Sequence, residues 1–193
     1  MIRILAVAAM AAAMFTAGPA QAGEMLAPGV SEDTLSSEPA LVTLAPQAVA
    51  YVRLKTVRNT PESRDLISGT FKRIWALARR HGVKIVGSPM EIMDAYEQAD
   101  GSWIVDAAIP VDAVRAGLAD AGDIVFARLP GGAAAQAAHR GAHEAIKTTH
   151  DRIGAFLAGR ELTARGRIAE QHFDDPHKVP EEKLRSAVTY FLE

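Results

Sequence analysis

The sequence predicts an α+β fold in which a β-α-β-β unit occurs twice in tandem. One segment with helical spacing of apolar residues lies in each half of the chain. Each is preceded by apolar, β-branched or small-residue segments and followed by two segments with strand character. Because each unit has one helix on one face of its strands, we expect an antiparallel curved sheet with two main helices on one side and a groove between the halves.

Composition sets limits on the kind of protein. The chain has 193 residues, of which 49% are hydrophobic and 23% charged, which is typical of a globular protein. The formal net charge of −2 gives no basic excess, so we expect no nucleic-acid partner. The chain contains no cysteine, which excludes disulfides, thiolate catalysis and cysteine-ligated zinc.

The N-terminal residues 1–22 have the pattern of a signal peptide. Arg3 precedes an apolar run from Ile4 to Phe15, and Ala20-Gln21-Ala22 supplies the small residues of a cleavage site. As a helix, the run would span about 18 Å, short of the ~30 Å hydrocarbon core of a membrane. We expect cleavage after Ala22, a periplasmic or secreted protein, and no stable membrane insertion.

The first half is expected over residues 41–115, after a flexible linker at 23–40 that is rich in Ser, Glu, Pro and Gly. Two apolar segments, Leu41–Leu44 and Ala48–Leu54, flank Pro46 and indicate a strand bent at that proline.

A helix is predicted from Asp65 to His81, because apolar residues recur there at helical spacing. The expected stripe, with Trp75 in the core, consists of Ile67, Phe71, Ile74, Trp75 and Ala78. Strands are predicted at Met90–Tyr96 and Trp103–Val111, joined by a hairpin turn at Asp100-Gly101.

The second half is expected over residues 122–193. A strand at Ile124–Leu129 is followed by Pro130-Gly131-Gly132, and we expect the small residues of Ala133–Arg140 to complete that strand. Apolar spacing then predicts a helix at His143–Leu157. The remaining strands are predicted at Arg167–Phe173 and Leu184–Leu192.

Three motifs of the second half carry a family resemblance. They are Leu129-Pro130-Gly131-Gly132, the run from His139 to His143, and the run from Glu170 to Pro176. In this order and spacing they resemble the GyrI-like family, also known as gyrase-inhibitor-like or AraC-type effector-binding domains. The resemblance covers residues 41–193 and implies a domain that binds small molecules.

The chain departs from the family pattern at residues that bear on the ligand. His143 stands where the family has an aromatic residue after His-x-Gly, and His172 stands where it has the tyrosine after the glutamate. Met93 lies where a tyrosine is frequent. The resemblance therefore implies the fold more strongly than the choice of ligand.

Glu170 is the strongest candidate for a functional residue. In a strand, Glu170 and His172 share one face, and Ala169 and Phe173 share the other. We expect Ala169 and Phe173 to face the helices, and Glu170 and His172 to face the groove. The resemblance implies that this glutamate neutralises an organic cation, which aromatic rings would also attract. The candidate ligand-binding residues are Glu170, His172, Tyr51, Met93, Tyr96, Trp103 and Thr189.

Three histidines near the second helix raise the question of a metal site. His139 and His143 are four residues apart, but Gly141 lies between them and marks a turn. We therefore expect these two and His150 to be solvated or to cap the helix, with no metal site and no cofactor.

The function that these observations favour is the binding of a small apolar or cationic molecule between the two halves. An alternative is a hydrolase of small electrophilic compounds that uses Glu170, with His172 as a proton-transfer partner. Whether the protein is an enzyme is left open, with binding preferred. Haem binding is a third and weaker hypothesis, because a haem-binding family shares the duplicated architecture.

Overall fold

The computed structural model describes residues 36–58, 60–94, 98–118 and 120–193. Its elements, in chain order, are β1 (Ala40–Leu44), β2 (Gln47–Thr56), α1 (Pro61–Arg80), β3 (Met90–Asp94), β4 (Trp103–Pro110), β5 (Val125–Leu129), β6 (Gly132–Arg140), η2 (His143–Ile146), α2 (Lys147–Ala158), β7 (Ala164–His172), η3 (Glu181–Lys183) and β8 (Arg185–Leu192), where η marks a 3₁₀ helix.

The N-terminal region lies largely outside this description. The predicted signal peptide at 1–22 is outside the described residues, as is most of the predicted linker at 23–40. From Ser36 the chain is tied to the sheet, because the carbonyl of Ser36 accepts a 2.8 Å hydrogen bond from the Ala138 amide in β6. Within the described part, no helix is both long and apolar enough to cross a membrane.

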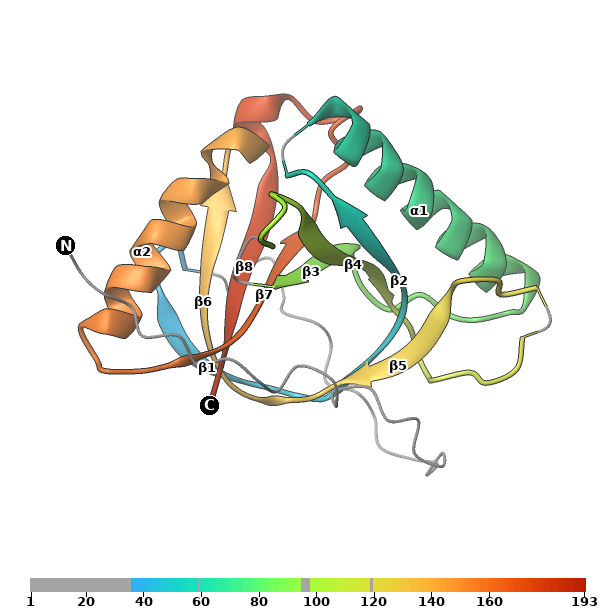
Figure 1. Cartoon of the computed structure of the whole chain (residues 1–193), viewed down its shortest axis with the longest axis horizontal. Coiled ribbons are helices and arrows are strands. Elements are labelled where there is room, and N and C mark those ends of the chain that lie inside the picture. Colours follow the sequence, from blue (N-terminus) through green and yellow to red (C-terminus); the bar gives the residue numbers. More distant parts are fainter. Residues whose placement is uncertain (1–35, 59, 95–97, 119) are drawn as a thin grey trace.

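The eight strands of the described residues form one antiparallel sheet in the order β1-β6-β8-β7-β3-β4-β2-β5 (Figure 1). The chain passes from β1 at one edge to β2 near the other through Ala45-Pro46. It likewise passes from β5 to β6 through Pro130-Gly131. Because both links run side by side, with Leu44 opposite Gly132 and Gln47 opposite Leu129, they connect the two ends of the sheet and curl it into a half-barrel.

The expectation that Ala133–Arg140 completes the strand before it is wrong. These residues belong to β6, which pairs with β1 and β8, whereas β5 pairs with β2. Gly131 lies where the strand breaks, and a Cβ there would collide with the backbone carbonyl of Leu44. The glycine therefore permits the close crossing of the two kinked strands.

Helix α1 begins four residues before the predicted start. Thr60 caps it by accepting a 3.1 Å hydrogen bond from the Ser63 amide, and Pro61 occupies the first turn. The prediction that Trp75 lies in the core is wrong, since Trp75 is 45% exposed. It follows the fully buried Ile74 by about 100° around the helix, and Leu77 completes the buried stripe instead.

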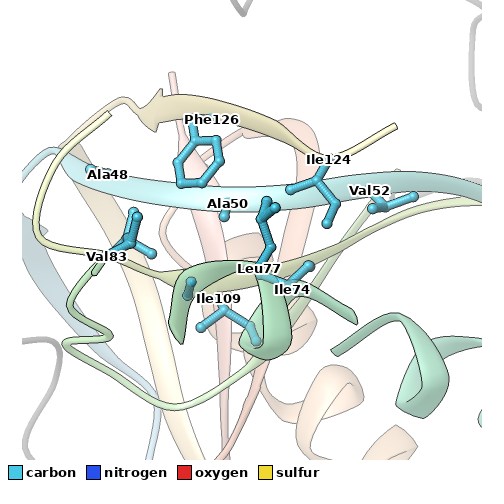
Figure 2. Close-up of a cluster of buried hydrophobic side chains, with 11 residues drawn as sticks. Ala48, Ala50, Val52, Ile74, Leu77, Val83, Ile109, Ile124 and Phe126 are labelled. Atoms are coloured by element: carbon cyan, nitrogen blue, oxygen red, sulfur yellow. The ribbon is translucent and has the colours of Figure 1, made fainter. Parts of the chain in front are cut away.

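Helix α1 packs on one end of the sheet and α2 on the other (Figure 1). Figure 2 shows the cluster beneath α1, which contains Ala48, Ala50, Val52, Ile74, Leu77, Ala78, Val83, Ile109, Val111, Ile124 and Phe126. The cluster beneath α2 contains Ala135, Ala137, Ile146, Ile153, Leu157, Val188 and Leu192. The register from β2 to β6 places both clusters on the same face of the sheet, which we call the helix face.

The opposite face of the sheet is also buried. Side chains from six strands pack together there, and they include Val49, Tyr51, Met90, Ile92, Ala108, Leu129, Ala169 and Phe191. These side chains all come from one sheet and pack against each other. The sheet therefore curls around this face, because a flat sheet would leave them exposed to water. The observed architecture confirms the predicted α+β class, with a curled antiparallel sheet and two main helices.

Several element boundaries differ from the predictions by a few residues. The predicted helix at His143–Leu157 is split into η2 and α2, and the predicted strand at Arg167–Phe173 begins earlier, as β7. Strand β3 is described only to Asp94, because residues 95–97 are outside the described part.

Candidate ligand-binding site

Glu170 lies in β7, near the middle of the sheet, on the helix face. It is paired with Glu91 of β3 on one side and Val188 of β8 on the other. The prediction that Ala169 faces the helices is wrong: Ala169 packs on the opposite face, beside Tyr51. Glu170 therefore points to the side that carries α1 and α2, and not away from them.

Three cationic or imidazole groups surround the Glu170 carboxylate, which is 1% exposed. Arg58, between β2 and α1, donates from Nη2 to Oε1 over 2.6 Å. His150 of α2 contacts the same oxygen through Nε2 at 2.8 Å. His143 of η2 places its Nε2 3.5 Å from Oε2. The carboxylate thus joins groups from both halves of the chain.

These partners keep Glu170 ionised. Burial by itself would raise the pKa of this carboxyl group, but the hydrogen bond and charge of His150 and the charge of Arg58 outweigh burial and lower it to about 2. Glu170 is therefore a fixed negative charge at neutral pH, held in a place of low polarity where a positive group is strongly attracted.

His150 connects Glu170 to a tyrosine. Its Nδ1 lies 3.0 Å from the hydroxyl of Tyr190 in β8, while its Nε2 faces Glu170. Nε2–H donates to the carboxylate in either protonation state, while the Tyr190 hydroxyl accepts from Nδ1–H of the charged ring or donates to Nδ1 of the neutral ring. Burial raises the pKa of Tyr190, so its hydroxyl keeps the proton for this contact.

A cavity of about 40 Å³ opens beside Glu170. Its lining residues are Thr56, Arg58, Ser63, Arg64, Ile67, Glu91, Met93, Trp103, Val105, His143 and Glu170. The guanidinium carbon of Arg58 lies 5.1 Å from the centroid of the Trp103 ring, within range of a cation–π contact. The volume is well below the ~300–1,000 Å³ of drug-sized ligand sites, and the Arg58 side chain forms part of the lining.

A second polar group lies next to the cavity. His172 Nε2 is 3.2 Å from Glu91 Oε1, and its Nδ1 is 3.3 Å from the Ser186 hydroxyl. Burial works to lower the pKa of His172, but the hydrogen bond and charge of Glu91 raise it overall. The ring of His143 lies 4.8 Å from that of His172, and burial together with the charge of His172 lowers the pKa of His143.

The seven predicted ligand-binding residues lie at or beside the cavity, on the opposite face of the sheet, or outside the described residues. Glu170, Met93 and Trp103 line the cavity, and His172 lies beside it on the same face. Tyr51 packs on the opposite face.

Two residues of that set remain. Thr189 also lies on the opposite face, where its hydroxyl accepts a 2.8 Å hydrogen bond from Gln136 Nε2. Tyr96 is outside the described residues.

Arg58 and His150 were not among the predicted site residues. The expectation of a solvated or capping role is wrong for His150, whose side chain is 10% exposed and bound to Glu170. His139 is not solvated either: its ring is buried, and it contacts the Thr149 hydroxyl and the Ala142 carbonyl. The seven-residue spacing of His143 and His150 places both on one flank of the helix, and this signal could have pointed to a shared acidic partner.

The geometry describes a site that holds a positive group. A buried carboxylate, a tryptophan ring and a small cavity lie between the starts of α1 and α2, and the guanidinium of Arg58 is in contact with the first two. A second cation of similar shape could make the same contacts if the arginine moved away.

Comparison with known proteins adds a family and a fold. The model of the GyrI-like small molecule binding domain matches residues 37–190, which is most of the chain. No curated protein matches the sequence significantly.

Solved structures have the same fold at low identity. The C-terminal domain of EcmrR is 14% identical, with a TM-score of 0.69, over 81% of this chain and 97% of that one. A hydrolase from Listeria innocua is 12% identical, with a TM-score of 0.61, over 83% and 94%. SAV2435 bound to tetraphenylphosphonium is 15% identical, with a TM-score of 0.53, over 81% and 94%. At these identities the likeness shows the fold alone.

Proposed function

The chain belongs to the GyrI-like small molecule binding domain family, and on that basis we propose that it binds a small organic cation at Glu170. The bound cation takes the place that the guanidinium of Arg58 occupies in the free protein. Trp103 contributes the aromatic face of the site, and His150 holds the carboxylate in position.

The contact between Arg58 and Glu170 is the observation that carries this proposal. The guanidinium lies 2.6 Å from the carboxylate and 5.1 Å from the Trp103 ring, which is how a charged ligand would be held. The Arg58 side chain is 31% exposed and comes from the segment between β2 and α1, so it can turn into solvent without breaking a strand or a helix. Its departure would enlarge the cavity.

Charge and size define the class of ligand. A cation that replaces Arg58 keeps the charge balance around Glu170 unchanged, whereas a neutral or anionic ligand would leave a buried charge without a partner. The small cavity favours a flat cation with N–H donors, such as an amidinium or guanidinium group on an apolar body. Tetraphenylphosphonium, the ligand of the structurally similar SAV2435, is also an organic cation.

Binding is favoured over hydrolysis by the ionisation of Glu170. A general base works best when its pKa is near the working pH, and a carboxylate with a pKa of about 2 is a weak base at neutral pH. The hydrolase from Listeria innocua shares the fold at only 12% identity, which gives no support to catalysis by this chain.

We also propose that the fold is a tandem duplication with the site between its copies. The series β2-α1-β3-β4 recurs as β6-α2-β7-β8. In the sheet, β6-β8-β7 stands beside β3-β4-β2, so each strand has a counterpart at the same distance from the centre. A pseudo-two-fold axis between β7 and β3 would place Glu170 and Glu91 near the axis, which supports a ligand groove there.

Export to the periplasm or secretion is part of the proposal. The pattern of residues 1–22 supports it, with cleavage after Ala22 and a linker that follows and ends before Ser36, where the chain is tied to the sheet. Fractionation of cells with N-terminal sequencing tests this directly. A mature chain that begins at Gly23 in the exported fraction is expected, and an uncleaved chain in the cytoplasm would contradict it.

Calorimetric titration with benzamidine tests the binding function. Benzamide and benzoate, which have nearly the same shape but no positive charge, serve as matched ligands. We expect benzamidine to bind and the other two to bind at least tenfold more weakly, since only the amidinium can pair with Glu170. Equal binding of all three, or none by benzamidine, would overturn the proposal.

Two variants assign this binding to the proposed contact. Glu170→Gln should reduce benzamidine affinity at least tenfold, and Arg58→Ala should increase it about tenfold, because the competing guanidinium is gone. Glu182→Gln, at an exposed glutamate that is not among the residues lining the cavity, is the control and should leave affinity unchanged. Weaker binding by Arg58→Ala would mean that the arginine helps the ligand and does not compete with it.

A further inference from the structure

We propose that Glu91, His143 and His172 form a binding site for a divalent transition metal ion such as Zn²⁺. In the part of the chain that the structure describes, these residues each offer one ligand atom, and the three atoms lie within 4.8 Å of one another. They come from β3, η2 and β7 and meet on the helix face beside the cavity. No metal site was predicted from the sequence, where only His139, His143 and His150 were considered as ligands and Gly141 separates the first two.

The donor set has the chemistry of a zinc site. Two imidazoles and one carboxylate suit Zn²⁺ and its neighbours in the first transition row, and three protein ligands leave a position open for water or another small ligand. Mg²⁺ and Ca²⁺ prefer sites made of oxygen atoms and would bind poorly.

The distances already approach those of a metal site. Metal–ligand bonds of ~2.0–2.1 Å in a tetrahedron separate neighbouring ligand atoms by about 3.3 Å. His172 Nε2 and Glu91 Oε1 are 3.2 Å apart, so this pair needs almost no movement. His143 is the ligand that must approach. Its side chain is 33% exposed and belongs to a short 3₁₀ helix, which leaves it room to shift.

The two histidines have polar neighbours besides the metal ligands. Nδ1 of His172 lies 3.3 Å from the Ser186 hydroxyl, which leaves Nε2 directed at Glu91. Nε2 of His143 lies 3.5 Å from a carboxylate oxygen of Glu170. Such outer contacts orient imidazole ligands and fix which nitrogen carries the proton.

The metal site would be accessible from solvent. The exposed fractions of the Glu91, His143 and His172 side chains are 16%, 33% and 18%, so the site is partly buried but not closed. It shares Glu91 and His143 with the cavity lining, so a metal ion here would form one wall of the cavity. The proposal does not depend on cation binding at Glu170, because its three ligands are different residues.

Titration of tag-free protein with zinc chloride tests this proposal. We expect one ion per chain by calorimetry, and a visible absorption spectrum of tetrahedral cobalt when Co²⁺ is used instead. His143→Ala and His172→Ala should each weaken binding at least tenfold. His177→Ala, at an exposed histidine, is the matched control and should bind as the unaltered protein does.

Glu91→Gln provides a second route to the same answer if His172→Ala does not fold, since it removes a ligand and keeps the shape of the side chain. Circular dichroism without metal identifies folded variants. Absence of zinc binding by the unaltered protein would overturn the proposal, as would binding that the His143 and Glu91 variants leave unchanged. Arg58→Ala should retain zinc binding even though it alters benzamidine binding, and this separates the two sites.

Discussion

The two faces of the sheet each bury a carboxylate, and the carboxylates are held in different ways. Asp106, on the face opposite the helices, accepts hydrogen bonds from Arg53 at 2.7 and 2.9 Å and from Arg167 at 2.8 Å. All three residues lie in strands, and Arg53 is the direct cross-strand neighbour of Asp106.

Glu170, on the helix face, is held by residues outside the sheet. Arg58 lies between β2 and α1, His150 in α2 and His143 in η2. Asp106 keeps the 17% exposed Arg167 as a partner even when the 52% exposed Arg53 side chain turns away, whereas the arginine at Glu170 is Arg58, which is 31% exposed and comes from a connecting segment. The comparison teaches that burial and an arginine do not by themselves mark a binding site. The number of arginine partners and the burial of each side chain also bear on whether a ligand can replace one of them.

The largest effect on stability is expected at Asp106. Asp106→Asn should lower the free energy of unfolding by about 3–5 kcal/mol, because two arginines lose their counter-charge and Arg167, which is only 17% exposed, is left largely buried without it. Urea unfolding followed by circular dichroism measures the change. Asp151→Asn, at an exposed aspartate paired with Lys147 in α2, is the control and should leave the midpoint unchanged.

The same chemical change at Glu170 should have a smaller effect. Glu170→Gln should lower the free energy of unfolding by about 1–2 kcal/mol, since the Arg58 side chain can turn to solvent and the amide retains a hydrogen bond with His150. The measurement is the same urea unfolding. A loss as large as that of Asp106→Asn would remove the proposed distinction between the two faces.

Trp103 tests the aromatic part of the ligand site. Trp103→Leu should weaken benzamidine binding about 2- to 30-fold, which corresponds to a cation–π contact of roughly 0.5–2 kcal/mol. Trp75→Leu is the matched control, because Trp75 is 45% exposed and is not among the residues that line the cavity. Equal losses in both variants would mean that the effect does not come from the site.

Tyr51 gives the smallest expected effect and concerns the opposite face. Burial, followed by the charge of Asp106, raises the pKa of the Tyr51 hydroxyl above its ordinary value of 10.0. Because the pKa of Tyr51 is higher in the folded state than in the unfolded state, its neutral hydroxyl contributes stability that is fully present below about pH 10. This contribution is lost as the pH rises through the pKa of the folded state. Stability of Tyr51→Phe, measured from about pH 8 to about pH 11, should therefore fall less than that of the unaltered protein. The same loss of stability with rising pH in both proteins would contradict this placement of Tyr51.

Much of the fold could be predicted from the sequence, because apolar spacing and turn residues are local signals. The helix at Asp65–His81 and the strands at Met90–Tyr96 and Trp103–Val111 were found close to α1, β3 and β4. The break at Pro130-Gly131 was harder to interpret. The sequence marks a turn there but does not show that β5 and β6 pair with strands at opposite ends of the sheet.

The candidate site was predictable in part. Alternation along the strand correctly placed Glu170 and His172 on the same face. Which face this is could have been inferred from Ile168, which lies on that face and packs beneath α1. Arg58 could not be found by periodicity, since it lies between a strand and a helix. Its contact with Glu170 spans 112 positions of the chain and depends on how the whole sheet curls.

A crystal structure of the protein with benzamidine tests the central claim most directly, which is that Arg58 occupies the place of the ligand. We predict an amidinium within hydrogen-bond distance of Glu170 and over the Trp103 ring, with the Arg58 guanidinium turned out of reach of the carboxylate. Benzamidine bound on the other face of the sheet, or bound while Arg58 keeps its contact with Glu170, would contradict that claim.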